Sequence, residues 1–213
     1  MKVIYEDNHL LVIEKPVNVP MQADDSRDPD LLNMAKAYIK EKYNKPGEVY
    51  LGLVHRLDRP VGGVCVFART SKAAARLSRQ IADHSFRKPS LAVVEEHGLP
   101  QRGNLEDFLL KDQKTNIVKV DPKGKKAVLD YEVLRRKDEL ALIKVDLQTG
   151  RSHQIRVQFA SRNHPLWGDQ RYNKKAIVSQ QIALWSHRIE LEHPTTKEKM
   201  IFTSDTDRYP FNI

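Results

Sequence analysis

The alternation of apolar and polar positions predicts β-strands along most of this chain. Residues 2–15, "KVIYEDNHLLVIEK", read as two short strands joined by a polar turn at residues 6–9. The run "VCVFAR" is almost wholly apolar and has no solvated side, which suits a strand in the middle of a sheet. Further strands are expected in "VYLGLV", "LAVVEE", "NIVKV", "AVLDYEVL", "LALIKVDL", "ALWSHRIELEH" and "KMIFTS".

Three segments have helical periodicity instead. Asp30 can cap a helix that begins near Leu31, and its apolar face is expected to hold Leu32, Ala35 and Ile39. Ser71 is expected to cap a second helix over "KAAARLSRQIADH", with a packed side formed by Ala74, Leu77, Ser78 and Ile81. A third helix is expected after Gly150. Many antiparallel-looking strands with few helices predict an α+β fold.

The length and the continuity of the chain predict a compact organisation. A chain of 213 residues can bury its core as one domain, or as two small lobes that share a sheet. No repeat, low-complexity segment or long linker divides it. We therefore expect a single domain over residues 1–213.

Charge and cysteine content narrow the class of protein. The 36 Lys and Arg exceed the 28 Asp and Glu, and the resulting net charge of +8 favours a polyanionic partner such as nucleic acid. The single cysteine, Cys65, allows no internal disulfide and no multi-cysteine zinc site, and is expected to be a small buried apolar side chain. No apolar run approaches the ~20 residues that span a bilayer. We expect a cytoplasmic protein without membrane association, and no obligate protein partner is evident.

The first motif with chemical content is "LVHRLDRPVGG", residues 53–63. It follows an apolar run, and it places the Asp58 carboxylate between Arg56 and Arg59 and then ends on two glycines. One interpretation is a surface ion pair. The other is a carboxylate that is held ionised for catalysis in a basic site.

The second motif is "LQTGRSHQIRVQFA", residues 147–160. Ile155 and Phe159 at helical spacing place Arg151 at a strand-to-helix junction, where side chains often enter a cleft. Taken singly, Arg151, His153 and Arg156 are each more simply interpreted as solvated surface groups. The sequence has no P-loop spacing, no His-x-x-x-His pair and no Gly-x-Ser-x-Gly elbow.

Together the motifs are more specific than either is alone. "HRLDRPVGG", "TGRSHQIR" and "HPLWGDQRY", in this order, resemble the RluA-type family of RNA pseudouridine synthases. The opening "DNHLLVIEKP" with "VPMQ" and the closing "ALWSHRIELEHPTTKE" match the same family, so the resemblance covers nearly the whole chain. It implies a mixed, mainly antiparallel sheet with a central catalytic cleft, without the separate N-terminal RNA-binding domain of some members.

The resemblance also implies a reaction and roles for residues. Without a cofactor or metal, a uridine in ribosomal or transfer RNA would be cut at its glycosidic bond, rotated and rejoined through its fifth ring carbon. Asp58 matches the catalytic aspartate and Arg151 its ionic partner, while Arg56 would occupy the RNA stack left by the flipped nucleotide. A covalent intermediate and an elimination both stay open for Asp58. The remaining substrate-binding positions would be His55, Gly62, Gly63, Ser90 and Arg156.

Ser90 departs from the family pattern, which usually has a tyrosine there. That tyrosine packs against the uracil and is a candidate base for the last proton removal, and serine has neither a ring nor a phenol. An RNA-binding pseudoenzyme with weak or no catalysis is therefore the alternative. A nonspecific nucleic-acid binder is a weaker alternative, because a pure binder needs no buried carboxylate facing phosphates.

Overall fold

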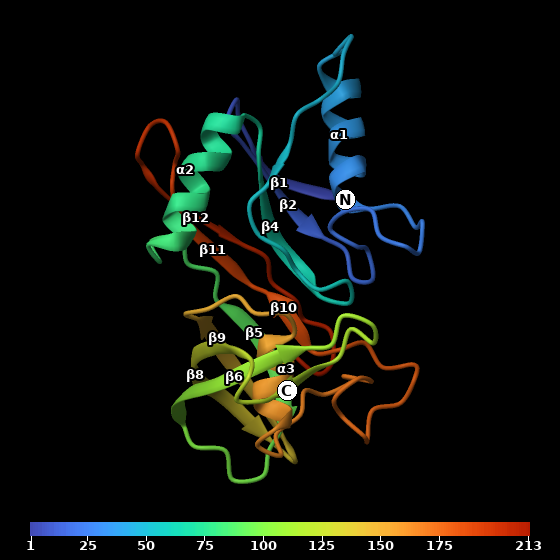
Figure 1. The fold of residues 1–213 in the computed structure, drawn as a ribbon, viewed down its shortest axis with the longest axis vertical. Helices are drawn as coiled ribbons and strands as arrows, with labels where there is room; N and C mark the ends of the chain where they lie inside the picture. The colour runs from blue at the N-terminus through green and yellow to red at the C-terminus, as the bar shows by residue number, and fades with distance from the viewer. The chain divides into compact units, whose positions relative to one another are not determined.

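The computed structural model describes residues 1–213, which divide into two compact units. Unit 1 comprises Met1–Lys88 and Ser186–Asp205, and unit 2 comprises Pro89–Trp185 and Thr206–Ile213. The predicted α+β class with mainly antiparallel strands is confirmed (Figure 1). None of the three helices has both the length and the apolar character needed to cross a membrane.

Unit 1 is built on the antiparallel strands β1 (Lys2–Glu6), β2 (Leu10–Lys15) and β4 (Gly62–Ala68), in that order, with the short β3 (Gly52–Leu53) also paired to β4. The hairpin β1–β2 and the apolar strand β4 are as predicted. Helix α1 is Leu31–Lys42, helix α2 is Ser71–Ala82, and a separate hairpin is formed by β11 (Arg188–Glu192) and β12 (Lys199–Thr203).

All of β4 is buried because both of its faces are covered. Val64 and Val66 pack with residues of α2 and the β11–β12 hairpin, and Cys65 and Phe67 pack with residues of α1 on the other face. This is the strict alternation of a two-sided strand. Cys65 is fully buried, and burial raises the pKa of its thiol to about 12, so it behaves as the predicted apolar side chain.

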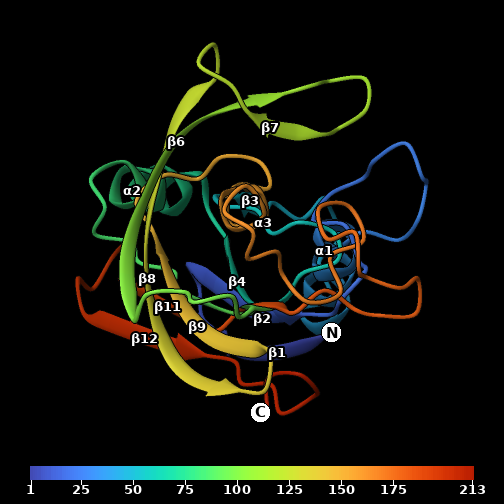
Figure 2. The same ribbon diagram turned by 90° about the horizontal axis from the view of Figure 1, so that it is seen from below.

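Unit 2 combines antiparallel strands with the short helix α3 (Gln154–Ala160). Its strands run in the order β5 (Ser90–Glu95), β9 (Leu140–Leu147), β8 (Lys125–Lys137), β6 (Arg102–Lys111) and β7 (Val118–Val120), with β10 (Leu184–Ser186) beside β5. Figure 2 shows β6 and β7 beside α3, and the apolar contact there joins Val157 of the helix to Leu109, Val118 and Ala127 of the strands.

The helix starts test the predicted caps. The Asp30 carboxylate accepts the Asn33 amide at 3.0 Å and caps α1 as predicted. The prediction for α2 is wrong by one residue, because the extended Thr70 is its cap and accepts the Ala73 amide at 3.1 Å. On its packed face Leu77 is buried as predicted, together with Ala73 and Gln80; Ala74 and Ile81 are partly buried against the same core, whereas Ser78 is exposed. Gln80 is buried because its amide makes two hydrogen bonds to the backbone of Glu192 in β11, at 2.7 and 2.9 Å.

One strand prediction is wrong, and one strand was not predicted. "ALWSHRIELEH" is not one strand, because β10 ends at Ser186 and belongs to the large sheet, whereas β11 begins at Arg188 and pairs only with β12 in a separate hairpin. Strand β6 was not predicted, since its buried leucines, Leu105 and Leu109, are four apart as in a helix. The inward position between them is Asp107, whose carboxylate is satisfied by Gln158 at 2.8 Å and by Arg162 at 2.7 Å.

Gly63 generates a prediction about stability. Its φ is +112°, and an added Cβ would lie 2.8 Å or less from three backbone atoms of Ser186, so neither conformation nor space allows a side chain. We expect Gly63→Ala to lower the free energy of unfolding by about 2 to 4 kcal/mol. Urea unfolding measures this. Gly47→Ala is the control, because nothing lies within 4 Å of its added Cβ, and equal effects of the two substitutions would contradict the prediction.

Candidate active site

The predicted site residues fall into two groups. His55, Arg56, Asp58, Gly62 and Gly63 lie on one loop and the start of β4 in unit 1. The other three, Ser90, Arg151 and Arg156, lie in unit 2. The first motif thus occupies one continuous segment of unit 1. The pairing of Asp58 with Arg151 joins residues of different units and stays a prediction.

Asp58 opens a tight turn that leads into β4. The amide of Val61 donates to the Asp58 carbonyl oxygen at 3.0 Å, which closes the turn around Arg59 and Pro60. The Asp58 side chain is half-buried, whereas Arg56 is exposed. The turn thus fixes the backbone that carries the carboxylate, while Arg56 stays accessible to a partner.

A buried ammonium group holds this turn from beneath. Lys15, the last residue of β2, is fully buried, and its Nζ donates to the carbonyl oxygens of Pro16 at 3.0 Å, Arg59 at 3.0 Å and Val61 at 2.6 Å. Burial lowers the pKa of Lys15 to about 8, and the nearby Cys65 and Asp58 side chains oppose this shift. All three donors of the ammonium are satisfied, so the charge serves to position the Asp58 turn.

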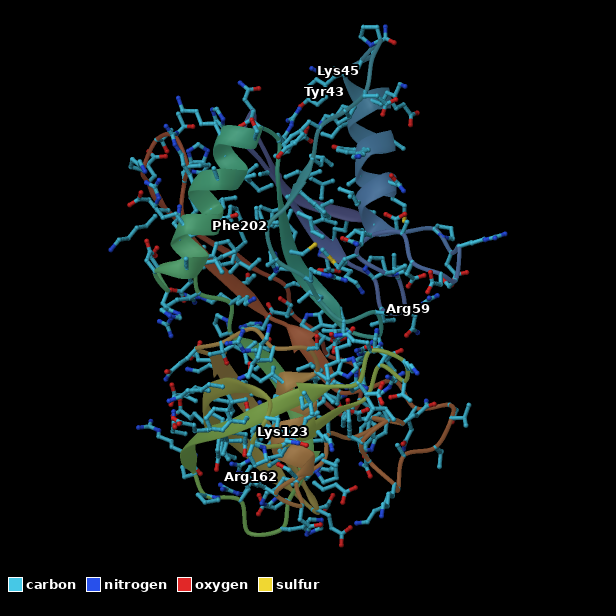
Figure 3. The ribbon with its side chains drawn as sticks, viewed as in Figure 1. Tyr43, Lys45, Arg59, Lys123, Arg162 and Phe202 are labelled. Carbon is cyan, nitrogen blue, oxygen red and sulfur yellow. The ribbon has the colours of Figure 1, made fainter.

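The second arginine that flanks Asp58 pairs with another loop of unit 1. Arg59, labelled in Figure 3, pairs with Asp28, donates to the Ser26 hydroxyl at 2.9 Å, and lies 3.6 Å from Asp24. The acidic loop between β2 and α1 therefore engages Arg59. Of the two arginines that flank Asp58, this leaves Arg56 as the exposed one.

His55 lies inside unit 1, with 5% of its surface exposed. Its Nε2 accepts the amide of Val66 at 3.0 Å, and its ring lies 5.7 Å from that of Phe86. Burial lowers the pKa of His55 to about 3, with a smaller effect of the charge on Lys88, so the ring is neutral. The ring hydrogen is then on Nδ1, a buried atom without a hydrogen-bond partner. The Nδ1 N–H of His55 therefore has no acceptor, and the substrate contact of His55 stays a prediction.

Arg151 sits on a turn held by an uncharged side chain. The Gln154 Oε1 accepts the Arg151 amide at 3.0 Å and the Thr149 hydroxyl at 2.8 Å, and its Nε2 donates to the Val128 carbonyl at 3.1 Å. The exposed Arg151 guanidinium donates through Nε to the Lys126 carbonyl at 2.8 Å. The strand-to-helix junction is as predicted, with α3 beginning at Gln154.

Arg156 is 6% exposed and forms a bidentate pair with Asp169, at 2.8 and 2.7 Å. Its guanidinium also lies 5.1 Å from the ring centre of Tyr172. This geometry gives Arg156 a structural part within unit 2, and its predicted contact with RNA stays a prediction. His153 has a left-handed backbone, φ 52°, and its Nδ1 lies 2.7 Å from the Tyr172 hydroxyl.

Ser90 is the first residue of β5, opposite Val145 of β9, and is 9% exposed. The relation of this side chain to a substrate stays a prediction.

Sequence reasoning missed the residues that position this site. Lys15 carries a signal, because it is a lysine at the end of an apolar strand and directly before a proline. Gln154 and Gln158 carry another, because two amides four apart lie on the buried side of α3. Asp169 and Tyr172 lie in the motif of residues 164–172, but the sequence does not show that their partners are Arg156 and His153.

Comparison with known sequences identifies a matching family and several relatives. The profile of the family described as "RNA pseudouridylate synthase" matches residues 9–161. The "Ribosomal large subunit pseudouridine synthase D" of Zymomonas mobilis is 33% identical over 220 residues, which cover 96% of this chain and 69% of that protein. The "Dual-specificity RNA pseudouridine synthase RluA" of Haemophilus influenzae is 30% identical over 219 residues, covering 97% of this chain and 94% of the relative.

Solved structures agree on the fold. The human RNA pseudouridylate synthase domain containing 4 superposes with a TM-score of 0.82 at 19% identity, covering 99% of this chain and 90% of that one. The similarity in fold therefore extends over both units.

The family profile spans both motifs, and the relatives align with almost the whole chain at 30% identity or more. This chain belongs to the RNA pseudouridylate synthase family, among its RluA-type members, and is an isomerase that acts on uridine in RNA.

Proposed function

We propose that the protein converts uridine to pseudouridine in ribosomal or transfer RNA, with Asp58 acting at the glycosidic bond. The observation that carries this proposal is the Asp58 turn: a half-buried carboxylate on a backbone fixed by the Val61 amide and the Lys15 ammonium. The relative named for the ribosomal large subunit supports ribosomal RNA as a substrate, and another relative is named as a dual-specificity RNA pseudouridine synthase.

The chemistry assigned to the residues follows the bonds that change. The bond between C1′ of the ribose and N1 of the uracil breaks, the uracil rotates, and C5 bonds to C1′. C5 then loses its hydrogen as a proton, and N1 gains one. Asp58 serves at the first step, either by attack on the sugar or by assisting an elimination. Arg151 keeps the carboxylate ionised, and the exposed Arg56 occupies the stack of the flipped nucleotide.

Replacement of the carboxylate tests this assignment. Asp58→Asn keeps the size of the side chain and removes the charge, so turnover should fall on the order of 100- to 10,000-fold while RNA affinity changes little. Tritium release from C5-labelled uridine in ribosomal RNA measures turnover. Asp25→Asn, an exposed position of the acidic loop, is the control for loss of one charge. Full activity of Asp58→Asn would refute the role of Asp58.

The Lys15 ammonium generates a second prediction. Lys15→Met keeps the buried chain but removes the donors to Pro16, Arg59 and Val61, so turnover should fall about 10-fold or more with RNA affinity almost unchanged. Amide hydrogen exchange of Val61 should accelerate, because the turn loosens. Unchanged turnover with accelerated exchange would show that the turn need not be rigid.

The same substitution has a pH signature. The folded-state pKa of Lys15 is about 8, below the ordinary value of 10.5, so the unfolded chain binds more protons between these values. The free energy of unfolding of the native protein should therefore rise relative to that of Lys15→Met as the pH increases from about 8 to 10.5. Parallel urea titrations across this range measure the difference. A constant difference would mean that Lys15 titrates normally.

Ser90 separates the enzyme from the pseudoenzyme alternative. If a ring at this position holds the uracil while it turns, Ser90→Tyr should raise turnover several-fold, whereas Ser90→Ala should not. Rapid-quench analysis on a fluorinated-uridine RNA separates bond cleavage from the final deprotonation. Ordinary family rates for the native protein, with no gain in Ser90→Tyr, would show that the tyrosine is dispensable and would remove the pseudoenzyme alternative.

A further inference from the structure

Half of the net charge of the chain is concentrated in one segment of unit 2. Residues 108–126, the end of β6 through β7 to the start of β8, are called the β6–β7 arm here. The arm has six lysines and two aspartates, a net charge of +4 against +8 for the whole chain. Five of the lysines are exposed, among them Lys123, labelled in Figure 3. No arginine is present, so the charges are compact ammonium groups on flexible stems.

The arm also exposes apolar surface. Three of the eleven exposed large apolar side chains of the protein lie in these 19 of 213 residues: Phe108 at 45%, Ile117 at 48% and Val120 at 44%. Phe108 is the only exposed phenylalanine of the chain. An exposed phenyl ring in a cationic segment is typical of surfaces that bind single-stranded nucleic acid.

The register of the strands places the ring among the ammonium groups. Leu109 and Val118 face α3, so their neighbours Phe108 and Lys119 lie on the outward face. Phe108 is directly opposite Lys126 on β8, and Leu110 is directly opposite Lys119 on β7. Side chains of such cross-strand pairs are in contact range. The outward face of the arm is therefore a phenyl ring with a lysine opposite it and another beyond Leu110.

The arm is fixed to the turn that carries Arg151. The Arg151 Nε donates to the carbonyl of Lys126, the residue opposite Phe108, at 2.8 Å. The amide of Val118 donates to the Tyr172 hydroxyl at 2.9 Å, and the same hydroxyl lies 2.7 Å from His153. The strands that carry the Phe108 ring are thus held at a fixed position relative to Arg151.

We infer that the outward face of the β6–β7 arm binds a single-stranded part of the RNA substrate, with Phe108 stacking on one unpaired base and Lys119 and Lys126 contacting phosphates. This inference rests on the proposed function and adds the kind of RNA: a substrate with unpaired nucleotides. Protein is the less suitable partner, because the apolar surface is divided by exposed ammonium groups.

The charged side chains around Phe108 are compatible with RNA binding. Lys126 is bound to Glu106 at 2.8 Å and Lys119 to Asp121 at 3.0 Å, and both are surface pairs that phosphates can replace at little cost. Farther along the same outward face, Asp130 and Asp146 lie opposite each other on β8 and β9. These carboxylates would repel a phosphate backbone, so the binding surface ends near Glu106.

Stacking of Phe108 on an unpaired base is tested with two labelled RNAs, a 15-nucleotide oligouridine and a blunt duplex. Phe108→Ala should weaken oligouridine binding about 5-fold or more and leave duplex binding within about 2-fold, since stacking needs an unpaired base. Phe108→Tyr should bind like the native protein. Leu134→Ala removes a similarly exposed apolar side chain, 49% exposed, outside the arm and should have no effect.

The lysines are tested by the salt dependence of oligouridine binding. The double variant Lys119→Gln, Lys126→Gln should reduce the slope of log K against log salt by about 1.4, because each single-strand phosphate contact contributes about 0.7. Lys40→Gln with Lys72→Gln, on the exposed sides of α1 and α2, is the control with equal loss of charge.

The outcomes separate this inference from the proposed function. If Phe108→Ala leaves oligouridine affinity unchanged while Asp58→Asn still loses pseudouridine formation, the inference about the β6–β7 arm is wrong and the enzyme assignment stays intact. Equal weakening by both lysine pairs would also overturn that inference, because the arm would then add only net charge. A dimer of the native protein that Phe108→Ala disperses would assign the surface to protein association instead.

Discussion

The catalytic loop depends on one buried ammonium group. The Nζ of Lys15, at the end of β2, donates to three backbone carbonyls, and two of them, those of Arg59 and Val61, belong to the Asp58 turn. Burying a charge is costly, and the pKa of about 8 records that cost. These hydrogen bonds hold the irregular segment around Asp58 in place, as the hydrogen bonds to a neighbouring strand hold a β-strand.

Unit 2 meets the same requirement without a charge. The Arg151 turn is held by the Gln154 amide, which serves as acceptor for an amide and a hydroxyl and as donor to a β8 carbonyl. A neutral amide costs less to bury than an ion. The two candidate catalytic residues thus share one physical principle: each exposed or half-buried functional side chain stands on a backbone fixed by a buried polar side chain.

The sequence alone determined many of the elements and the family. The alternation in β1 and β2, the two-sided burial of β4 and the Asp30 cap follow from local pattern, because side-chain period and capping act within a few residues. The paired motifs around Asp58 and Arg151 pointed to the family that the comparisons established. Both motifs consist of neighbouring residues, which a sequence displays directly.

Only the tertiary structure decided which polar residues hold the site. Arg59 engages the acidic loop, Arg156 is buried against Asp169, and His55 is enclosed in unit 1, although all three resemble free functional groups in the sequence. Strand β6 was hidden because Asp107 occupies an inward position that Gln158 and Arg162 satisfy. The physical reason is common to these cases: whether a polar side chain is solvated or buried depends on a partner far along the chain, and that partner is chosen by the fold.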